Sequence, residues 1–171
     1  MHDLAERQQA DVLVVGSTRH ALLGRVLMGD DCRAALDGAP CALAIAPRGY
    51  SLVPPCLERV GVGYDGSPKS EHALSAAHDL ARATRAAVTV LWVVSLQDVG
   101  REELVKLGTD VDLLIIGSCD HGRIGRLVHG SVSRYLVGHA TCPLLVLPTG
   151  TAAVGATPGA EREGKPVAVD G

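Results

Sequence analysis

The sequence predicts an α/β fold in which parallel strands are joined by helices. Its 171 residues are 47% hydrophobic but only 2% aromatic, so Val, Leu, Ile and Ala must build the core, as is typical of buried parallel strands under alanine-rich helices. Short apolar runs alternate with amphipathic segments, and this alternation indicates right-handed crossovers between parallel strands. A strand, loop, helix, strand pattern also occurs twice, which fixes the organisation of the chain.

The two copies of this pattern are residues 11–47 and 112–148, which align without gaps and are identical at 13 of 37 positions. Each copy has an apolar run, a Gly-Ser pair, a glycine-containing loop, an amphipathic helix and a short apolar run that ends in proline. A helix is expected over residues 3–9, before the first copy. We therefore expect the same unit to form twice.

A further strand, helix, strand unit precedes the second copy alone. Its first strand is expected over Val60–Tyr64, its helix begins with Ser67 as N-cap and Pro68 in the first turn, and its second strand lies in residues 87–94. A short helix is expected around Glu102–Leu107. The stripe predicted to face the core comprises Ala73, Leu74, Ala77, Leu80 and Ala81.

Composition excludes several classes of partner. The formal net charge of −3 comes without a basic stripe, so nucleic acid is not an expected partner. No apolar run approaches the length of a membrane span, and we expect a cytoplasmic protein that does not bind membranes. The five cysteines are expected to be reduced thiols, and no structural metal is expected because a second ligand pair at zinc spacing is lacking.

Two motifs resemble those of the universal stress protein family in its tandem, two-domain form. "GVGYDGSPKSEHAL" (61–74) resembles the first strand and Asp-Gly-Ser turn of the family, and "GSCDHGRIGRLVHGSVS" (117–133) resembles its nucleotide loop, G-x2-G-x9-G-[ST]. The resemblance covers roughly residues 1–148. It implies an open, doubly wound sheet of five parallel strands with helices on both faces, Rossmann-like and similar to the adenine nucleotide α-hydrolases, which binds ATP in some members.

The resemblance also implies a domain map. Residues 1–49 would be a partial repeat, the C-terminal half of a first domain, and residues 50–58 a linker. Residues 59–149 would form a second domain, shortened by one strand and one helix in its middle. Residues 150–171 are rich in Gly, Ala and Pro and are expected to be a disordered tail. In the family the last strands of two domains pair antiparallel, so residues 41–47 and 142–148 are expected to pair within the chain or across a dimer.

The loop at 117–133 offers a phosphate site at a strand-to-helix junction. Gly130 allows close approach of the backbone, and the N–H groups at the start of the helix can donate to phosphate oxygens. Asp120 stands where the motif has its second glycine, and its carboxylate should weaken binding, while Gly122 and nearby arginines can compensate. The expected nucleotide-binding residues are Asp65, Gly66, Ser67, Val93, Val94, Gly117, Asp120, Gly122, Gly130, Ser131, Val132 and Ser133.

Asp65 has two readings at this point. The resemblance places its carboxylate near the ribose of an adenosine, with backbone groups of Val93 and Val94 near the adenine. An Asx turn closing "YDGS" accounts for the same residue. In the first copy Arg19 replaces the second glycine and Asp30 the serine of the motif, so no nucleotide site is expected there.

The main hypothesis is a non-enzymatic stress-response protein whose second domain binds ATP weakly, with Mg²⁺ when bound. No Ser, His and Asp set or carboxylate pair supports catalysis. The glycines of "GVGYDG" (61–66) fall inside a predicted strand, which argues against a dinucleotide oxidoreductase. The alternatives are an interaction module that pairs without nucleotide and, third, a weak ATP hydrolase. Self-association is expected in either of the first two cases.

Overall fold

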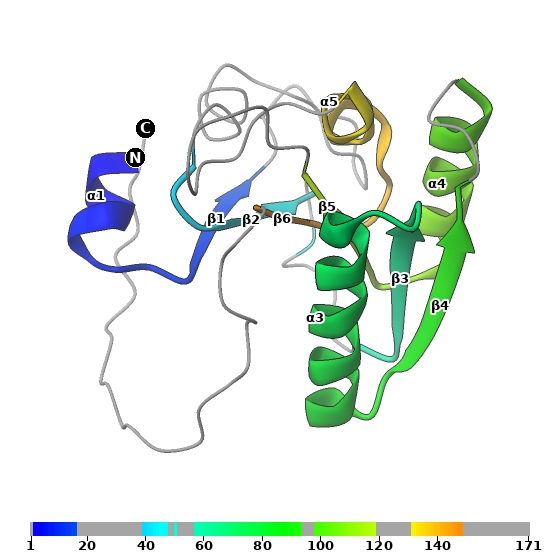
Figure 1. Cartoon of the computed structure of the whole chain (residues 1–171), viewed down its shortest axis with the longest axis horizontal. Helices are drawn as coiled ribbons and strands as arrows, with labels where there is room; N and C mark the ends of the chain where they lie inside the picture. The colour runs from blue at the N-terminus through cyan, green and yellow to red at the C-terminus, as the bar shows by residue number, and fades with distance from the viewer. Residues whose placement is uncertain are drawn as a thin grey trace.

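A computed structural model describes residues 2–16, 39–47, 50, 57–93, 98–118 and 131–148. Helices and strands alternate along most of the chain (Figure 1). In chain order they are α1 (His2–Arg7), β1 (Val12–Gly16), β2 (Ala42–Ala46), β3 (Arg59–Tyr64), α3 (Pro68–Thr84), β4 (Ala87–Trp92), α4 (Asp98–Asp110), β5 (Leu113–Gly117), α5 (Ser131–His139) and β6 (Leu144–Leu147). None of these described helices has the length and apolar character needed to cross a membrane.

The strands form one open, six-stranded sheet in the order β1-β2-β6-β5-β3-β4. Every neighbouring pair is parallel except β2 and β6, which run antiparallel with Leu43 opposite Val146 and Ile45 opposite Leu144. The predicted α/β class is therefore confirmed. The antiparallel pairing expected between residues 41–47 and 142–148 is also present, and it occurs within the chain.

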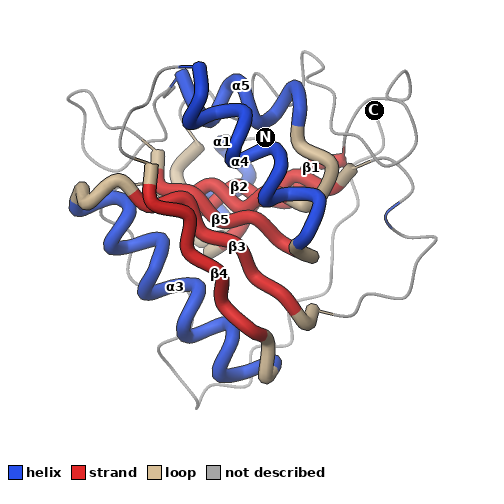
Figure 2. The backbone as a smooth tube through the Cα atoms, turned by 90° about the vertical axis from the view of Figure 1, so that its right-hand side faces the viewer, coloured by secondary structure: helices blue, strands red, loops and turns tan. Residues whose placement is uncertain are grey.

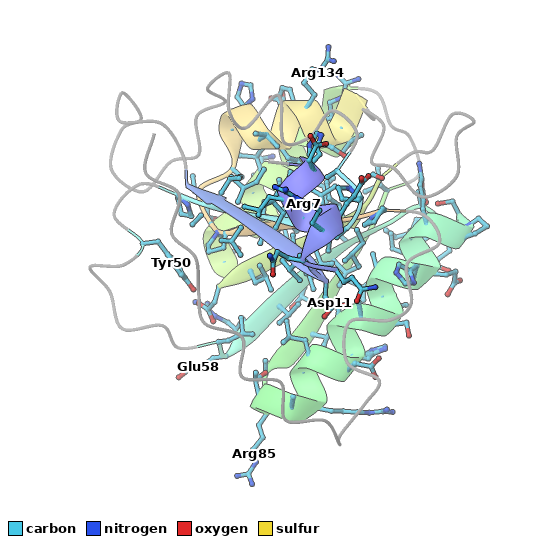
Figure 3. All side chains as sticks on the ribbon, turned by 90° about the vertical axis from the view of Figure 1, so that its left-hand side faces the viewer. Arg7, Asp11, Tyr50, Glu58, Arg85 and Arg134 are labelled. Atoms are coloured by element: carbon cyan, nitrogen blue, oxygen red, sulfur yellow. The ribbon has the colours of Figure 1, made fainter. Side chains whose placement is uncertain are left out.

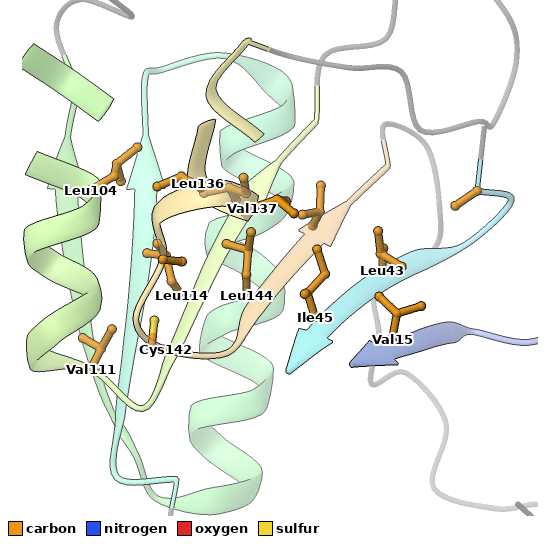
Figure 4. Close-up of a cluster of buried hydrophobic side chains, with 14 of the residues drawn as sticks. Val15, Leu43, Ile45, Leu104, Val111, Leu114, Leu136, Val137, Cys142 and Leu144 are labelled. Carbon is orange, nitrogen blue, oxygen red and sulfur yellow. The ribbon is translucent and has the colours of Figure 1, made fainter. Parts of the chain in front are cut away.

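Helices cover both faces of the sheet (Figure 2), with α3 on one side and α4 and α5 on the other. On the α4–α5 side, strands of both copies share one apolar cluster, in which Leu43 and Ile45 join Leu114, Leu136 and Leu144 (Figure 4). These five side chains are fully buried or nearly so. The strands of the first copy therefore belong to the same core as those of the second.

Helix α3 forms as the sequence predicts. The side chain of Ser67 accepts a hydrogen bond from the N–H of Ser70, and Pro68 occupies the first turn, where it removes no helical hydrogen bond. Leu74 and Leu80 of the predicted stripe are partly buried. The residues of the helix that are fully buried are small: Ser70, Ala73, Ala76, Ala77 and Ala81. Small side chains let the helix axis approach the sheet closely.

Helix α4 extends beyond the predicted segment Glu102–Leu107 at both ends. A Cβ added at Gly63 of β3 would lie 2.9 Å from Leu104 Cδ2, and one at Gly61 would lie 3.1 Å from Leu107 Cδ2. The strand thus carries glycines because α4 packs directly on it. This confirms that Gly61 and Gly63 of "GVGYDG" are strand residues, whereas Gly66 follows the strand in the turn to α3.

Candidate functional site at the carboxyl ends of β3 and β5

The carboxyl ends of β3 and β5 are adjacent, and the next described helices after these strands lie on opposite faces of the sheet. After β3 the chain enters α3 on one face, and the helix that follows β5 in the sequence, α5, lies on the other. In open α/β sheets such a switch point leaves a crevice at which ligands bind. The predicted site residues Asp65, Gly66 and Ser67 follow β3 here, and Gly117 ends β5.

Asp65 closes the turn between β3 and α3. Its Oδ1 atom accepts hydrogen bonds from the Ser67 N–H at 3.0 Å and from the Ser67 hydroxyl, and its Oδ2 atom lies 3.6 Å from Lys69 Nζ. Gly66 has φ +77°, a left-handed conformation that glycine adopts without strain. This is the Asx-turn reading of Asp65, while contact with a ribose stays a prediction.

The electrostatics of the turn favour an ionised carboxylate. Partial burial by itself raises the pKa of the Asp65 carboxyl, but the hydrogen bonds from Ser67 and Ser70 and the positive charge of Lys69 outweigh burial. The pKa of Asp65 is therefore lowered from its ordinary value. At neutral pH the turn presents a negative charge beside a lysine, a pair that can accept from hydroxyl groups and attract anions.

Gly117 lets the first turn of α3 pack against the end of β5. A Cβ at this position would lie 2.4 Å from the backbone oxygen of Lys69, so only glycine lets the first turn of α3 rest on the end of β5. Sequence reasoning interpreted Gly117 as a phosphate-loop glycine and did not single out Lys69. The signal for Lys69 was its position four residues after Asp65 at the start of a helix.

Of the other predicted site residues, the structure describes those at the start of α5 and leaves out four. Ser131 begins α5 as expected, and N–H groups in the first turn of a helix lack intrahelical partners. Val132 packs against the core, and Ser133 is buried with 3% of its surface exposed. The predicted residues Val94, Asp120, Gly122 and Gly130 lie outside the described residues.

Predictions from the sequence also concern Val93, the cysteines and a metal site. The N–H of Val93 donates to the backbone carbonyl oxygen of Tyr64 at 2.7 Å. This hydrogen bond extends the β3–β4 ladder by one residue beyond β4. Cys41 and Cys142 are free, buried thiols, and burial raises the pKa of Cys142 to about 12. In the described part of the chain no three His, Cys, Asp or Glu side chains come together as a metal site.

Together these features define an open-sheet α/β protein with a topological switch point between β3 and β5. The family model described as the universal stress protein family matches residues 57–109 and 103–148. The chain belongs to the universal stress protein family.

Solved structures show the same fold. A universal stress protein from Archaeoglobus fulgidus DSM 4304 superposes with a TM-score of 0.69 at 16% sequence identity, and a functionally unknown protein from Pseudomonas aeruginosa PAO1 superposes with 0.66 at 14%. Each match covers 86% of this chain and 66% of the other chain. This chain therefore spans about two thirds of the length of the structures it matches.

Proposed function

We propose that this stress-response protein of the universal stress protein family binds an adenine nucleotide weakly in the crevice between β3 and β5 and catalyses no reaction of its own. One observation carries the proposal: Gly117 seats the first turn of α3 on the end of β5, so the Asp65 turn and the start of the 117–133 motif adjoin at the switch point. Fold and motif thus indicate the same edge of the sheet.

Each part of the crevice has a chemical role in this proposal. The ionised Asp65 accepts hydrogen bonds from ribose hydroxyls, and Lys69 contributes a positive charge near the phosphates. The N–H groups that begin α5, from Ser131 to Ser133, donate to phosphate oxygens at the positive end of the helix dipole. A bound Mg²⁺ would neutralise part of the charge on the phosphates.

Asp120 is the residue by which this chain departs most from the family motif. Replacing it by glycine (Asp120→Gly) removes an anion from the phosphate neighbourhood and restores access to left-handed backbone angles. We expect ATP binding to tighten about tenfold, measured by titration calorimetry. The difference should shrink at high salt if charge repulsion is its main cause. Equal or weaker binding by the variant would contradict the proposed role of Asp120.

The natural chain gives the direct test of binding. Mass spectrometry of the purified protein should detect a copurified adenine nucleotide, or calorimetry should give a saturable ATP isotherm that Asp65→Ala weakens. Incubation with ATP should release no phosphate above the rate of a heat-denatured control. Copurified nucleotide that turns over steadily would instead support the weak hydrolase.

One observation favours the second candidate, a nucleotide-free interaction module. The Ser67 hydroxyl already donates to Asp65, and the Ser133 side chain is buried, so one expected ligand group is bonded within the protein and another is shielded from solvent. An empty purified protein that shows no ATP isotherm would support this candidate. In that case the antiparallel pairing of β2 with β6 would be the interaction that the module provides.

A further inference from the structure

The two copies of the repeat differ on the α3 side of the sheet. Val14 of β1 and Ile115 of β5 occupy matching positions in the alignment of residues 11–47 with 112–148, and both face the α3 side, as the registers of their strands show. Ile115 is fully buried, whereas 67% of the surface of Val14 is exposed. The same position of the repeat is therefore covered in one copy and open in the other.

In the second copy the cover comes from the β3–α3 unit. Strand β3 pairs with β5 in parallel, with Val62 opposite Ile115, and the small residues of α3 pack over both strands. Ala73 and Ala77 of α3 are completely buried in this contact. A strand and an alanine-rich helix together thus close the α3 side of β5.

The carboxylate of Asp112 holds the start of β3 in place. Asp112, just before β5, accepts hydrogen bonds from the N–H groups of Glu58 at 2.9 Å and Arg59 at 2.8 Å, where the chain enters β3. Asp11 is the matching residue of the first copy, and its side chain is exposed (Figure 3). Within the described residues no backbone N–H bonds the Asp11 carboxylate, and β1 pairs only with β2.

We propose that the outer edge of β1 at Val12 and Val14 and the exposed face around Val14 form a docking site for a strand–helix unit of a separate polypeptide. The occupant has the chemistry of residues 57–84: an apolar strand, parallel to β1, whose first N–H groups bond Asp11, followed by a helix with an alanine stripe that covers Val14. Helix α1 is no substitute, since Ala5 is its one buried residue. The proposal does not depend on nucleotide binding.

A second copy of this chain is a poorer occupant. Its own residues 57–84 already cover Ile115, and lending them to another molecule would uncover one site while covering the other. Such an exchange leaves the number of buried contacts unchanged and adds the entropic cost of association. A polypeptide with an uncommitted strand–helix unit has no such opposing loss.

The binding test adds a fluorescein-labelled peptide of residues 57–93 to the full chain. We expect a saturable, one-to-one rise in anisotropy with a Kd below about 100 μM. Val14→Glu should weaken binding at least about tenfold, because it places a charge under the incoming helix. Val90→Glu is the matched control, since Val90 is also exposed on the α3 side but lies at the opposite end of the sheet, and it should leave binding unchanged.

A fusion tests the same site even if ordering the free peptide costs more free energy than its binding releases. Residues 57–93 are joined through a Gly/Ser linker to the amino end of the full chain, which gives an effective concentration of about 1 mM. Hydrogen exchange at the amides of Val12 and Val14, which face away from β2, should slow at least about tenfold, and Val14→Glu should abolish the protection. Unchanged exchange in the fusion overturns the proposal. So does a homodimer of the natural chain that Val14→Glu dissociates, because a second copy would then be the occupant.

Discussion

Residues 11–47 and 112–148 share one sequence repeat, but different elements of the structure pack against the two copies. Their strands agree on the α4–α5 side of the sheet, where Val15 and its counterpart Ile116 are both buried in the shared cluster. They differ on the α3 side, where Val14 of the first copy is exposed to solvent and Ile115 of the second copy is buried. A repeat therefore determines its strands, whereas the burial of each strand face depends on elements outside the repeat. Three pairs of matched substitutions test this difference.

The largest contrast is expected between Ile115→Ala and Val14→Ala. Truncation of the enclosed Ile115 should lower the free energy of unfolding by about 3 to 4 kcal/mol, because it leaves a cavity between α3 and the sheet. Val14→Ala should change it by no more than about 0.5 kcal/mol, since most of that side chain is already in water. Urea denaturation measures both values. Equal losses would mean that the two faces are covered alike.

The second contrast concerns Gly117 and Gly16, which also match in the alignment. Gly117→Ala should destabilise the protein by about 2 to 3 kcal/mol, because the new methyl group meets backbone atoms of Lys69 that cannot rotate away. In the described part of the chain a methyl group at Gly16 meets nothing within 4 Å, so Gly16→Ala should be nearly neutral. Chemical denaturation of the two variants side by side is the measurement. A neutral Gly117→Ala would show that α3 does not rest on the end of β5.

The third contrast is smaller and concerns Asp112 and Asp11. Asp112→Ala removes the acceptor of two backbone N–H groups and should cost about 1 to 2 kcal/mol, whereas Asp11→Ala should cost less than about 0.5 kcal/mol. Differential scanning fluorimetry ranks the two variants, and urea titration gives the values. If Asp11→Ala proved equally costly, the first copy would already have a strand entering beside β1.

Acid titration sharpens the Asp112 contrast. Burial by itself raises the pKa of Asp112, but the N–H groups of Glu58 and Arg59 and the charge of Arg59 lower it, and the net pKa lies below its ordinary value of 3.8. A carboxylate with a lowered pKa stabilises the fold fully above that ordinary value and loses the contribution as pH falls through the lowered pKa. The stability gap between the natural chain and Asp112→Ala should therefore close below about pH 4. A gap that persists at pH 2 would point to packing instead of charge.

Much of the fold follows from local patterns in the sequence. The cap at Ser67, the proline after it and the alanine spacing predict α3, and apolar runs predict the strands. The site was less predictable, because its key contact joins Lys69 to Gly117 across the sheet. Gly16 and Gly117 follow equivalent apolar runs, and no local pattern distinguishes the one that lies beneath a helix. Helix α4 likewise exceeds its predicted length, and it packs against β3 and α5, which a local pattern does not include.

The β2–β6 pair also has a consequence for the order of events during synthesis. Leu43 and its partner Val146 are about 100 residues apart, so at about 5 to 20 residues per second β2 leaves the ribosome roughly 5 to 20 s before β6 exists. During that interval β1 and β2 have no partner on the β6 side and expose an apolar edge, which makes them candidates for chaperone binding. Closing so long a loop is slow, so the first copy should join the sheet last, after β3 to β6 have folded around α3.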